Sequence, residues 1–324
     1  MFNRNHRFPP LFQAQRRHYC KAIIAGIALA LMPKSTRGDG VSNVGGLEIT
    51  DGLGRQVSLA RPPQRIVSIF SSNTELLHAL GATDRIVGIE DFTRYPPDIR
   101  DGRTIVGGRL GFSVETIARL EPDLVVMTPA RQAVNTLLKP MQTIGVPVVV
   151  MLHRNLAEIF SNLRLLGHVL GNSLHAESVI GQLQQRLQSV DQQLAGVRRP
   201  RVYFETGQND RGNFTTVRKG HYTYDALLQA GAESIFGDLD QITQVSGEAI
   251  IAADPEVILL ARNDGNPDSI KHRPGWQNIS AVRNNRVFVV PRELFLIPGP
   301  RIVDGVEMLA PLLHPNVFVD QDTA

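Results

Sequence analysis

Strands and helices alternate along most of this chain, and one long stretch in its middle breaks the alternation. From residue 65 to 151, short β-rich apolar runs alternate with helical patterns, and the alternation resumes at residue 201. Residues 155–197 show no strand pattern. Alternating strands and helices favour an α/β fold with mostly parallel sheets. The middle stretch predicts a helix over 155–171 and a longer one over 174–196, which would span about 34 Å.

The first half of the chain predicts four strands and three shorter helices. The strands are expected at residues 65–70, 84–89, 123–127 and 146–151, and the helices at 74–82, 114–122 and 131–144. Glycine near a helix end and proline beyond it are the expected stop signals.

The second half of the chain repeats the spacing of acidic residues, glycine and proline that is found in the first half. In each half an acid precedes a glycine by six residues, and a glutamate precedes a proline by seven. The matching positions are Glu75 with Asp225, Gly81 with Gly231, Glu115 with Glu248, and Pro122 with Pro255. The alternative is that any two α/β domains share such spacing, but two motifs in the same order favour an internal repeat.

These patterns predict two similar α/β lobes joined by one long helix. The expected boundaries are 41–171 for the N-terminal lobe, 172–198 for the linking helix and 199–324 for the C-terminal lobe. A cleft between two lobes is the usual place for a ligand.

Residues 1–40 have the composition of a signal peptide. They contain seven Lys and Arg against one Asp, followed by the short apolar run 22–32 and the small-residue pattern at 28–30, as in secretory signals. Arg16-Arg17 and Lys21 also fit a twin-arginine signal, and an ordinary basic segment is the alternative. Since the whole chain has a formal net charge of +3, the mature protein would carry about −3, which does not favour binding to nucleic acid.

The single cysteine, Cys20, precedes the apolar run 22–32. A lipid-modified cysteine would have to follow that run. We therefore expect a soluble periplasmic protein that is not a lipoprotein, and that has no disulfide and no cysteine-ligated metal after cleavage.

Common catalytic motifs are absent from the sequence. It contains no P-loop, HExxH, GxSxG or GxGxxG pattern and no cysteine pair, which removes the most easily recognised enzyme classes without excluding an enzyme. His153, after a predicted strand, and His221, in a predicted loop, leave open a receptor for free zinc or manganese. An exported α/β enzyme without a recognisable motif is the alternative from another class.

Several segments, in order, resemble the class III periplasmic binding proteins. The N-terminal segments are RIVSIFSSNTELLHALGATDRIVGI, DFTRYPPDI and VETIARLEPDLVVM, and the C-terminal ones are QVSGEAIIAADPEVILL, GWQNISAVRNNRVFVV and GPRIVDGVEMLAPLL. These proteins are receptors of ABC importers for cobalamin, ferric siderophores and haem. The resemblance covers roughly residues 47–315 and implies two α/β lobes bridged by a rigid helix. It also implies a monomer that hands a metal chelate to a permease, is not an enzyme and has no intrinsic cofactor.

The resemblance also implies roles for two glutamates. In the family, one exposed glutamate on each lobe docks on arginines of a dimeric membrane permease, and the matching residues are Glu115 and Glu248. These are the paired glutamates of the internal repeat, so two equivalent charges would meet two equivalent basic pockets.

The family lines its ligand cleft from loops at strand ends. The candidate ligand-binding residues at such loops are Phe92, Arg94, Tyr95, Arg109, Phe112, Phe214, Phe295 and Arg301. Haem receptors often have an iron-ligating tyrosine at the position of Tyr95. Cobalamin receptors place tryptophans where this chain has Arg109 and Ile242, which argues against cobalamin. The arginines favour an anionic iron complex, either haem or a ferric siderophore, with cobalamin as the remaining chelate.

Overall fold

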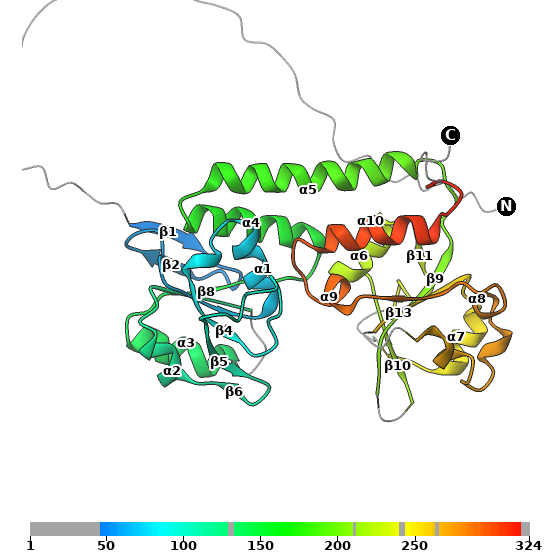
Figure 1. The fold of residues 1–324 in the computed structure, drawn as a ribbon, viewed down its shortest axis with the longest axis horizontal. Helices are drawn as coiled ribbons and strands as arrows, with labels where there is room; N and C mark the ends of the chain where they lie inside the picture. The colour runs from blue at the N-terminus through cyan, green and yellow to red at the C-terminus, as the bar shows by residue number, and fades with distance from the viewer. Residues whose placement is uncertain (1–45, 129–132, 210–211, 240–243, 263–265, 319–324) are drawn as a thin grey trace, which may run out of the picture. The chain divides into compact units, whose positions relative to one another are not determined.

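The computed structural model describes residues 46–128, 133–209, 212–239, 244–262 and 266–318. The expected signal peptide, Cys20 and Ile242 lie outside these ranges. Residues 44–324 form one compact unit, which contains a β-hairpin, two larger sheets and the helices that cover them (Figure 1). The hairpin pairs β1 (Leu47–Thr50) with β2 (Gln56–Leu59) in antiparallel register.

The N-terminal lobe is built on a six-stranded sheet of order β6-β5-β4-β3-β7-β8. Its strands are β3 (Ile66–Ile69), β4 (Ile86–Glu90), β5 (Thr104–Gly108), β6 (Gly111–Phe112), β7 (Leu124–Met127) and β8 (Val148–Val150). All neighbours pair in parallel except β5 and β6. The helices are α1 (Ser71–Ala79), α2 (Val114–Arg119), α3 (Ala133–Thr143) and α4 (Leu156–Val169), with a 3₁₀ turn at Thr83–Arg85.

The C-terminal lobe has a sheet of order β12-β10-β9-β13-β14, with β11 also paired to β9. Its strands are β9 (Arg201–Gln208), β10 (Phe214–Thr216), β11 (Glu233–Ser234), β12 (Gln244–Val245), β13 (Val257–Ala261) and β14 (Val287–Val290). Its helices are α6 (Tyr222–Gln229), α7 (Gly247–Ala253), α8 (Ser280–Arg283), α9 (Arg292–Phe295) and α10 (Ile302–Leu313), with 3₁₀ turns at Pro267–Ile270 and Trp276–Asn278.

The central strands bury both of their faces, so their continuous apolar runs fit a covered sheet. Successive side chains of a strand point to opposite faces. In β7, Leu124 and Val126 join the core beside α4, whereas Val125 and Met127 pack with α3 residues. In β13, the alternate residues Ile258 and Leu260 belong to a third cluster, around Trp276.

The long helix α5 (Ser173–Gln193) carries one apolar stripe for both lobes. Its buried residues recur at alternating intervals of four and three, at Ala176, Ile180, Leu183, Leu187 and Val190, as on one face of a helix. The helix α5 lies along α4 and α10 (Figure 1). Its apolar stripe belongs to one continuous hydrophobic cluster that includes residues of α4, α10 and both sheets.

The expected fold class is confirmed, with one refinement. The N-terminal sheet is mostly parallel, but the C-terminal sheet is mixed because β10 and β12 pair in antiparallel register. The exact lobe boundaries remain predictions, since residues 44–324 pack as a single unit. None of the helices in the described ranges combines the length and apolarity needed to cross a bilayer.

His153 has a buried, hydrogen-bonded ring at the end of the N-terminal sheet. Its side chain is buried just after β8, and its ring nitrogens lie 3.0 Å from Asn73 Oδ1 and 3.2 Å from Asn162 Nδ2. The neutral ring can thus donate to Asn73 through Nε2 and accept from Asn162 at Nδ1. Burial lowers the pKa of His153 to about 4, although the nearby Glu158 carboxylate acts in the opposite direction.

This buried histidine predicts a loss of stability in mild acid. The folded-state pKa lies below the ordinary value of about 6.5, so the unfolded chain binds a proton first as the pH falls. The contribution of His153 is complete above pH 6.5 and is lost between about pH 6.5 and 4, by about 3 kcal/mol. Urea unfolding of His153→Gln should show a smaller loss over this range than the wild type. The exposed His175→Gln serves as the control, and equal pH slopes for all three proteins would contradict the prediction.

Candidate functional site

Exposed apolar side chains gather at one edge of the N-terminal sheet. The strands β3, β4 and β5 are parallel neighbours, so their carboxyl ends share an edge. Phe70 follows β3, Phe92 follows β4, and Leu110 lies in the turn after β5. The side chain of Phe70 is 36% exposed, that of Phe92 is 54% exposed, and that of Leu110 is fully exposed. We call Phe70, Phe92 and Leu110 the apolar edge. The carboxyl ends of strands are where open α/β sheets bind ligands.

Phe70 is held in an unusual backbone conformation. Its φ is +90°, which is a genuine outlier for a bulky residue. The conformation is fixed by the start of α1, where the Asn73 N–H donates to the Phe70 carbonyl at 3.0 Å and Asn73 Nδ2 donates to Ile69 at 2.7 Å. Backbone strain of this kind concentrates at functional sites. Phe70 was not among the residues predicted from the sequence, although an aromatic residue between a strand and a helix is a signal that could have identified it.

The predicted N-terminal residues other than Tyr95 lie along the same edge. Arg94 is exposed and donates to the Asp91 and Thr93 carbonyls. Arg109 is exposed in the turn between β5 and β6, whereas Phe112 is half-buried against the core beneath. Phe92 and Arg109 are therefore available to a ligand, and Phe112 only in part.

Tyr95 lies at the junction of the two lobes. Its ring meets His78 edge-on, with centroids 5.4 Å apart, and the Arg301 guanidinium lies 4.0 Å from its centroid. Tyr95 and Arg301 line a pocket of about 240 Å³. Glu75, His78, Leu183 of α5, and Asp304 also line it. Arg301 Nη2 also donates to Glu75 Oε1 at 2.6 Å. Its charge is therefore engaged by protein groups rather than free for an anionic ligand.

Two of the predicted ligand residues need correction. Phe214 is only 5% exposed and meets Trp276 edge-on, with ring centroids 5.1 Å apart. Phe295 has no exposed surface and packs on Phe204. Both rings belong to hydrophobic cores, because β10 and α9 turn them inward, so neither presents a face to a ligand.

The C-terminal lobe presents arginines that were not among the residues predicted from the sequence. Buried Glu205 in β9 binds Arg262 at 2.6 Å and Arg273 at 2.6 and 2.9 Å. Arg292, which follows β14, is exposed and donates to the last carbonyl of β13. Arg262 and Arg273 share this one carboxylate, and the exposed Glu293 follows Arg292 in α9. Arg262 directly follows β13 and Arg292 lies two residues after β14, and these positions were the signal in the sequence.

Glu115 and Glu248 occupy equivalent exposed positions. Each is the second residue of a short helix, α2 or α7, whose N-cap serine accepts a backbone N–H, from Thr116 at 3.1 Å and from Ala249 at 3.2 Å. Hydrogen bonds from its own backbone N–H and from Ser246 hold the pKa of Glu248 below its usual range. Both side chains are free to meet a partner protein.

His153 and His221 are both engaged in the fold. His153 is hydrogen-bonded as described above, and His221 caps α6 by accepting from the Thr223 N–H. Burial lowers the pKa of His221 to about 4. Within the described ranges, no three His, Cys, Asp or Glu side chains come together as a group that could hold a metal ion.

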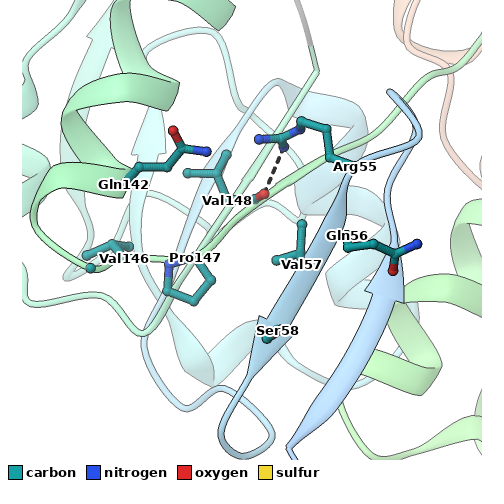
Figure 2. Close-up of a pocket in the computed structure, with 9 residues that line it drawn as sticks. Arg55, Gln56, Val57, Ser58, Gln142, Val146, Pro147 and Val148 are labelled. Carbon is teal, nitrogen blue, oxygen red and sulfur yellow. Dashed lines mark hydrogen bonds between the residues drawn. The ribbon is translucent and has the colours of Figure 1, made fainter.

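A separate pocket of about 250 Å³ lies between β2 and the start of β8 (Figure 2). Arg55, Gln56, Val57, Gln142 and the 145–148 segment line it, and Arg55 Nη2 donates to the Val148 carbonyl at 3.0 Å. None of the predicted ligand residues borders this pocket. It also lies at the beginning of β8, away from the carboxyl ends of the strands, so we do not assign it to the ligand.

Comparison with known proteins identifies relatives of this chain. A substrate-binding lipoprotein of an ABC transporter from Bacillus subtilis, YvrC, is 24% identical over 302 residues, covering 91% of this chain and 94% of that protein. The vitamin B12-binding protein of Vibrio cholerae is 26% identical, covering 78% and 90%. The crystal structure of a periplasmic heme-binding protein from Pseudomonas aeruginosa is 25% identical, with a TM-score of 0.66, and covers 78% and 93%.

The Bacillus subtilis relative contradicts the expected localisation. It is a lipoprotein, so the prediction of a soluble protein without a lipid anchor is wrong. That prediction depended only on the position of Cys20 before residues 22–32, which lie outside the described ranges. An anchor is set by the export segment and leaves no trace in the folded lobes, so the rest of the chain offered no check.

The family assignment rests on more than half of the chain. Residues 66–294 match the periplasmic binding protein family, and the shared fold with a solved member confirms the expected α/β architecture. The relatives include substrate-binding proteins of ABC transporters. This chain therefore belongs to the periplasmic binding protein family: it is a ligand-binding receptor that works with the permease of an ABC importer, and it is not an enzyme.

Proposed function

We propose that the receptor binds a metal chelate between its two lobes and delivers it to the permease. The observation that carries the proposal is the apolar edge of Phe70, Phe92 and Leu110, with the exposed Arg109 beside it. A chelate with an apolar face and anionic substituents would match aromatic surface on one lobe and arginines on the other. The lobe division at 41–171, 172–198 and 199–324 belongs to the same proposal.

The second part of the proposal concerns which chelate the receptor binds. Haem and ferric siderophores suit the arginines Arg109, Arg262 and Arg292 through their carboxylate or catecholate groups. Cobalamin is the other candidate, because the Vibrio cholerae relative binds vitamin B12. We favour an iron complex, because Arg109 and Arg292 are exposed at the two edges and would pair with its anionic groups. If the ligand is haem, Tyr95 is the proposed iron ligand, after release from Arg301.

Absorption spectroscopy tests the proposal directly. Receptor purified from its native cells, and apo receptor titrated with haemin, a ferric catecholate, cyanocobalamin, Zn²⁺ or Mn²⁺, should bind one of the three chelates at about 1:1. A Soret band identifies haem, a visible charge-transfer band a siderophore, and a corrin spectrum cobalamin. Binding of Zn²⁺ or Mn²⁺ without a chromophore would favour the free-metal alternative and contradict the proposal.

The apolar edge predicts separate effects on affinity and stability. Phe92→Ala removes an exposed ring and should weaken chelate binding about tenfold, or about 1.4 kcal/mol, while stability changes by no more than about 0.5 kcal/mol. Phe70→Gly should weaken binding similarly without loss of stability, because glycine adopts φ near +90° without strain. Calorimetric titration and thermal unfolding measure the two effects. Leu174→Ala, at another exposed apolar site, is the control; unchanged affinity in both phenylalanine variants would exclude this edge.

We propose that Glu115 and Glu248 dock the receptor on the permease, one glutamate from each lobe. The double variant Glu115→Arg/Glu248→Arg should abolish uptake of the chelate while its affinity for the free receptor stays unchanged. Helix-terminus charge effects are only about 0.3–1 kcal/mol each, so the fold should persist. The control is Glu48→Arg/Glu233→Arg, which makes the same change of charge at two other exposed sites. Wild-type uptake by the docking variant would refute the docking role.

A further inference from the structure

Two acids that are equivalent in the internal repeat both reach across to the opposite lobe. Glu75 lies in α1 and Asp225 in α6, each six residues before a glycine with positive φ, Gly81 at +71° and Gly231 at +80°. Glu75 contacts Arg301, which precedes α10 of the C-terminal lobe. Asp225 Oδ2 accepts the N–H of Leu156, the first residue of α4 in the N-terminal lobe, at 3.0 Å.

The two contacted helices are equivalent as well. α4 follows β8, the last strand of its sheet along the chain, and α10 comes after β14, the last strand of the other sheet. Both helices pack on α5. The contact from α1 to the start of α10 thus has its counterpart in the contact from α6 to the start of α4. Such reciprocity is the property of a two-fold interface.

The Glu75 contact is closely fitted. The carboxylate is 1% exposed and lies against Gly299, where a Cβ atom would be 2.3 Å from Glu75 Oε2. Arg301 donates at 2.6 Å and stacks on the Tyr95 ring, so Arg301 joins two segments of the N-terminal lobe to its own. Gly299 is therefore needed for the close approach.

The same contact is incompletely satisfied, unlike the backbone cap at Asp225. Among the described residues, Glu75 Oε2 and Arg301 Nε are buried without a hydrogen-bond partner. Burial raises the pKa of Glu75, and the Arg301 hydrogen bond offsets this only in part. The adjoining pocket of about 240 Å³ leaves space beside the pair. A buried ion pair that lacks some of its hydrogen bonds has fewer of them to lose than a fully bonded pair. It is therefore easier to separate.

We propose that Glu75 and Asp225 form a reciprocal clamp that fixes the angle between the lobes, with Asp225 as its permanent side and the Glu75–Arg301 pair as the side that opens. Glu75, Asp225 and Arg301 are then positioning residues. Arg301, predicted as a ligand contact, acts through lobe geometry. The effect on lobe geometry is independent of the proposed function, whereas the effect on ligand exchange rests on it.

Distance measurements between the lobes test the clamp. Spin labels at Lys139→Cys in α3 and Gln277→Cys in the C-terminal lobe, both exposed, in a Cys20→Ser background, report the lobe separation in the full chain. We expect Glu75→Ala and Asp225→Ala each to broaden the distance distribution. Asp225→Asn should restore the wild-type width, because its amide oxygen still accepts from Leu156. Gly299→Ala should reproduce Glu75→Ala by displacing the carboxylate without removing it.

Ligand exchange provides the second readout. Dissociation of the chelate identified by spectroscopy should accelerate about tenfold in Glu75→Ala. Glu177→Gln removes an ion pair with Arg164 that joins α4 to α5 and serves as the control, with no change in either measurement. Distributions in Glu75→Ala, Asp225→Ala and Gly299→Ala that match the wild type would overturn the clamp. Broadened distributions with unchanged dissociation would leave the clamp standing and contradict binding of the chelate between the lobes.

Discussion

The apolar stripe of α5 is the interaction on which the rest of the structure depends. Five buried side chains on one face of this helix, from Ala176 to Val190, join a single core that reaches both sheets through α4 and α10. Apolar burial contributes about 25 cal/mol per Å², so a core shared in this way strongly disfavours separation of the lobes. Large hinge rotations would expose part of it. The receptor can therefore change the lobe angle only within limits that this helix sets.

The shared core is built around α5 and the helices beside it, and the exposed residues at the carboxyl edges of the sheets are not part of it. These residues can therefore serve function. In the N-terminal lobe, the strained Phe70 and the exposed Phe92 bring no evident benefit to folding. In the C-terminal lobe, Arg262 and Arg273 share the single carboxylate of Glu205. Natural proteins break local rules at functional sites and compensate for them elsewhere. Here the compensation lies in cores on both faces of each sheet.

The sequence was a good guide to the elements and a poor one to side-chain direction. The helix expected over 174–196 is found at Ser173–Gln193, and the paired glutamates Glu115 and Glu248 occupy equivalent helix starts. Periodicity carries such information because it reflects burial along one element. Phe214 and Phe295 looked like loop aromatics, yet both are buried. Their direction depends on contacts with Trp276 and Phe204, which are distant in sequence, so local patterns could not reveal it.

The internal repeat relates the two lobes of this one chain as a two-fold axis relates the subunits of a symmetric dimer. A two-fold interface uses each contact twice, and the acids of α1 and α6 follow this rule although their partners differ, an arginine side chain in one case and a backbone N–H in the other. A strictly symmetric clamp would give both sides equal strength and no preferred direction of opening. Replacing one backbone cap by a buried, incompletely bonded ion pair breaks that equivalence. Since the shared α5 core resists large separations, such a difference between the two sides is sufficient to direct a small movement to the side of Tyr95 and Arg301.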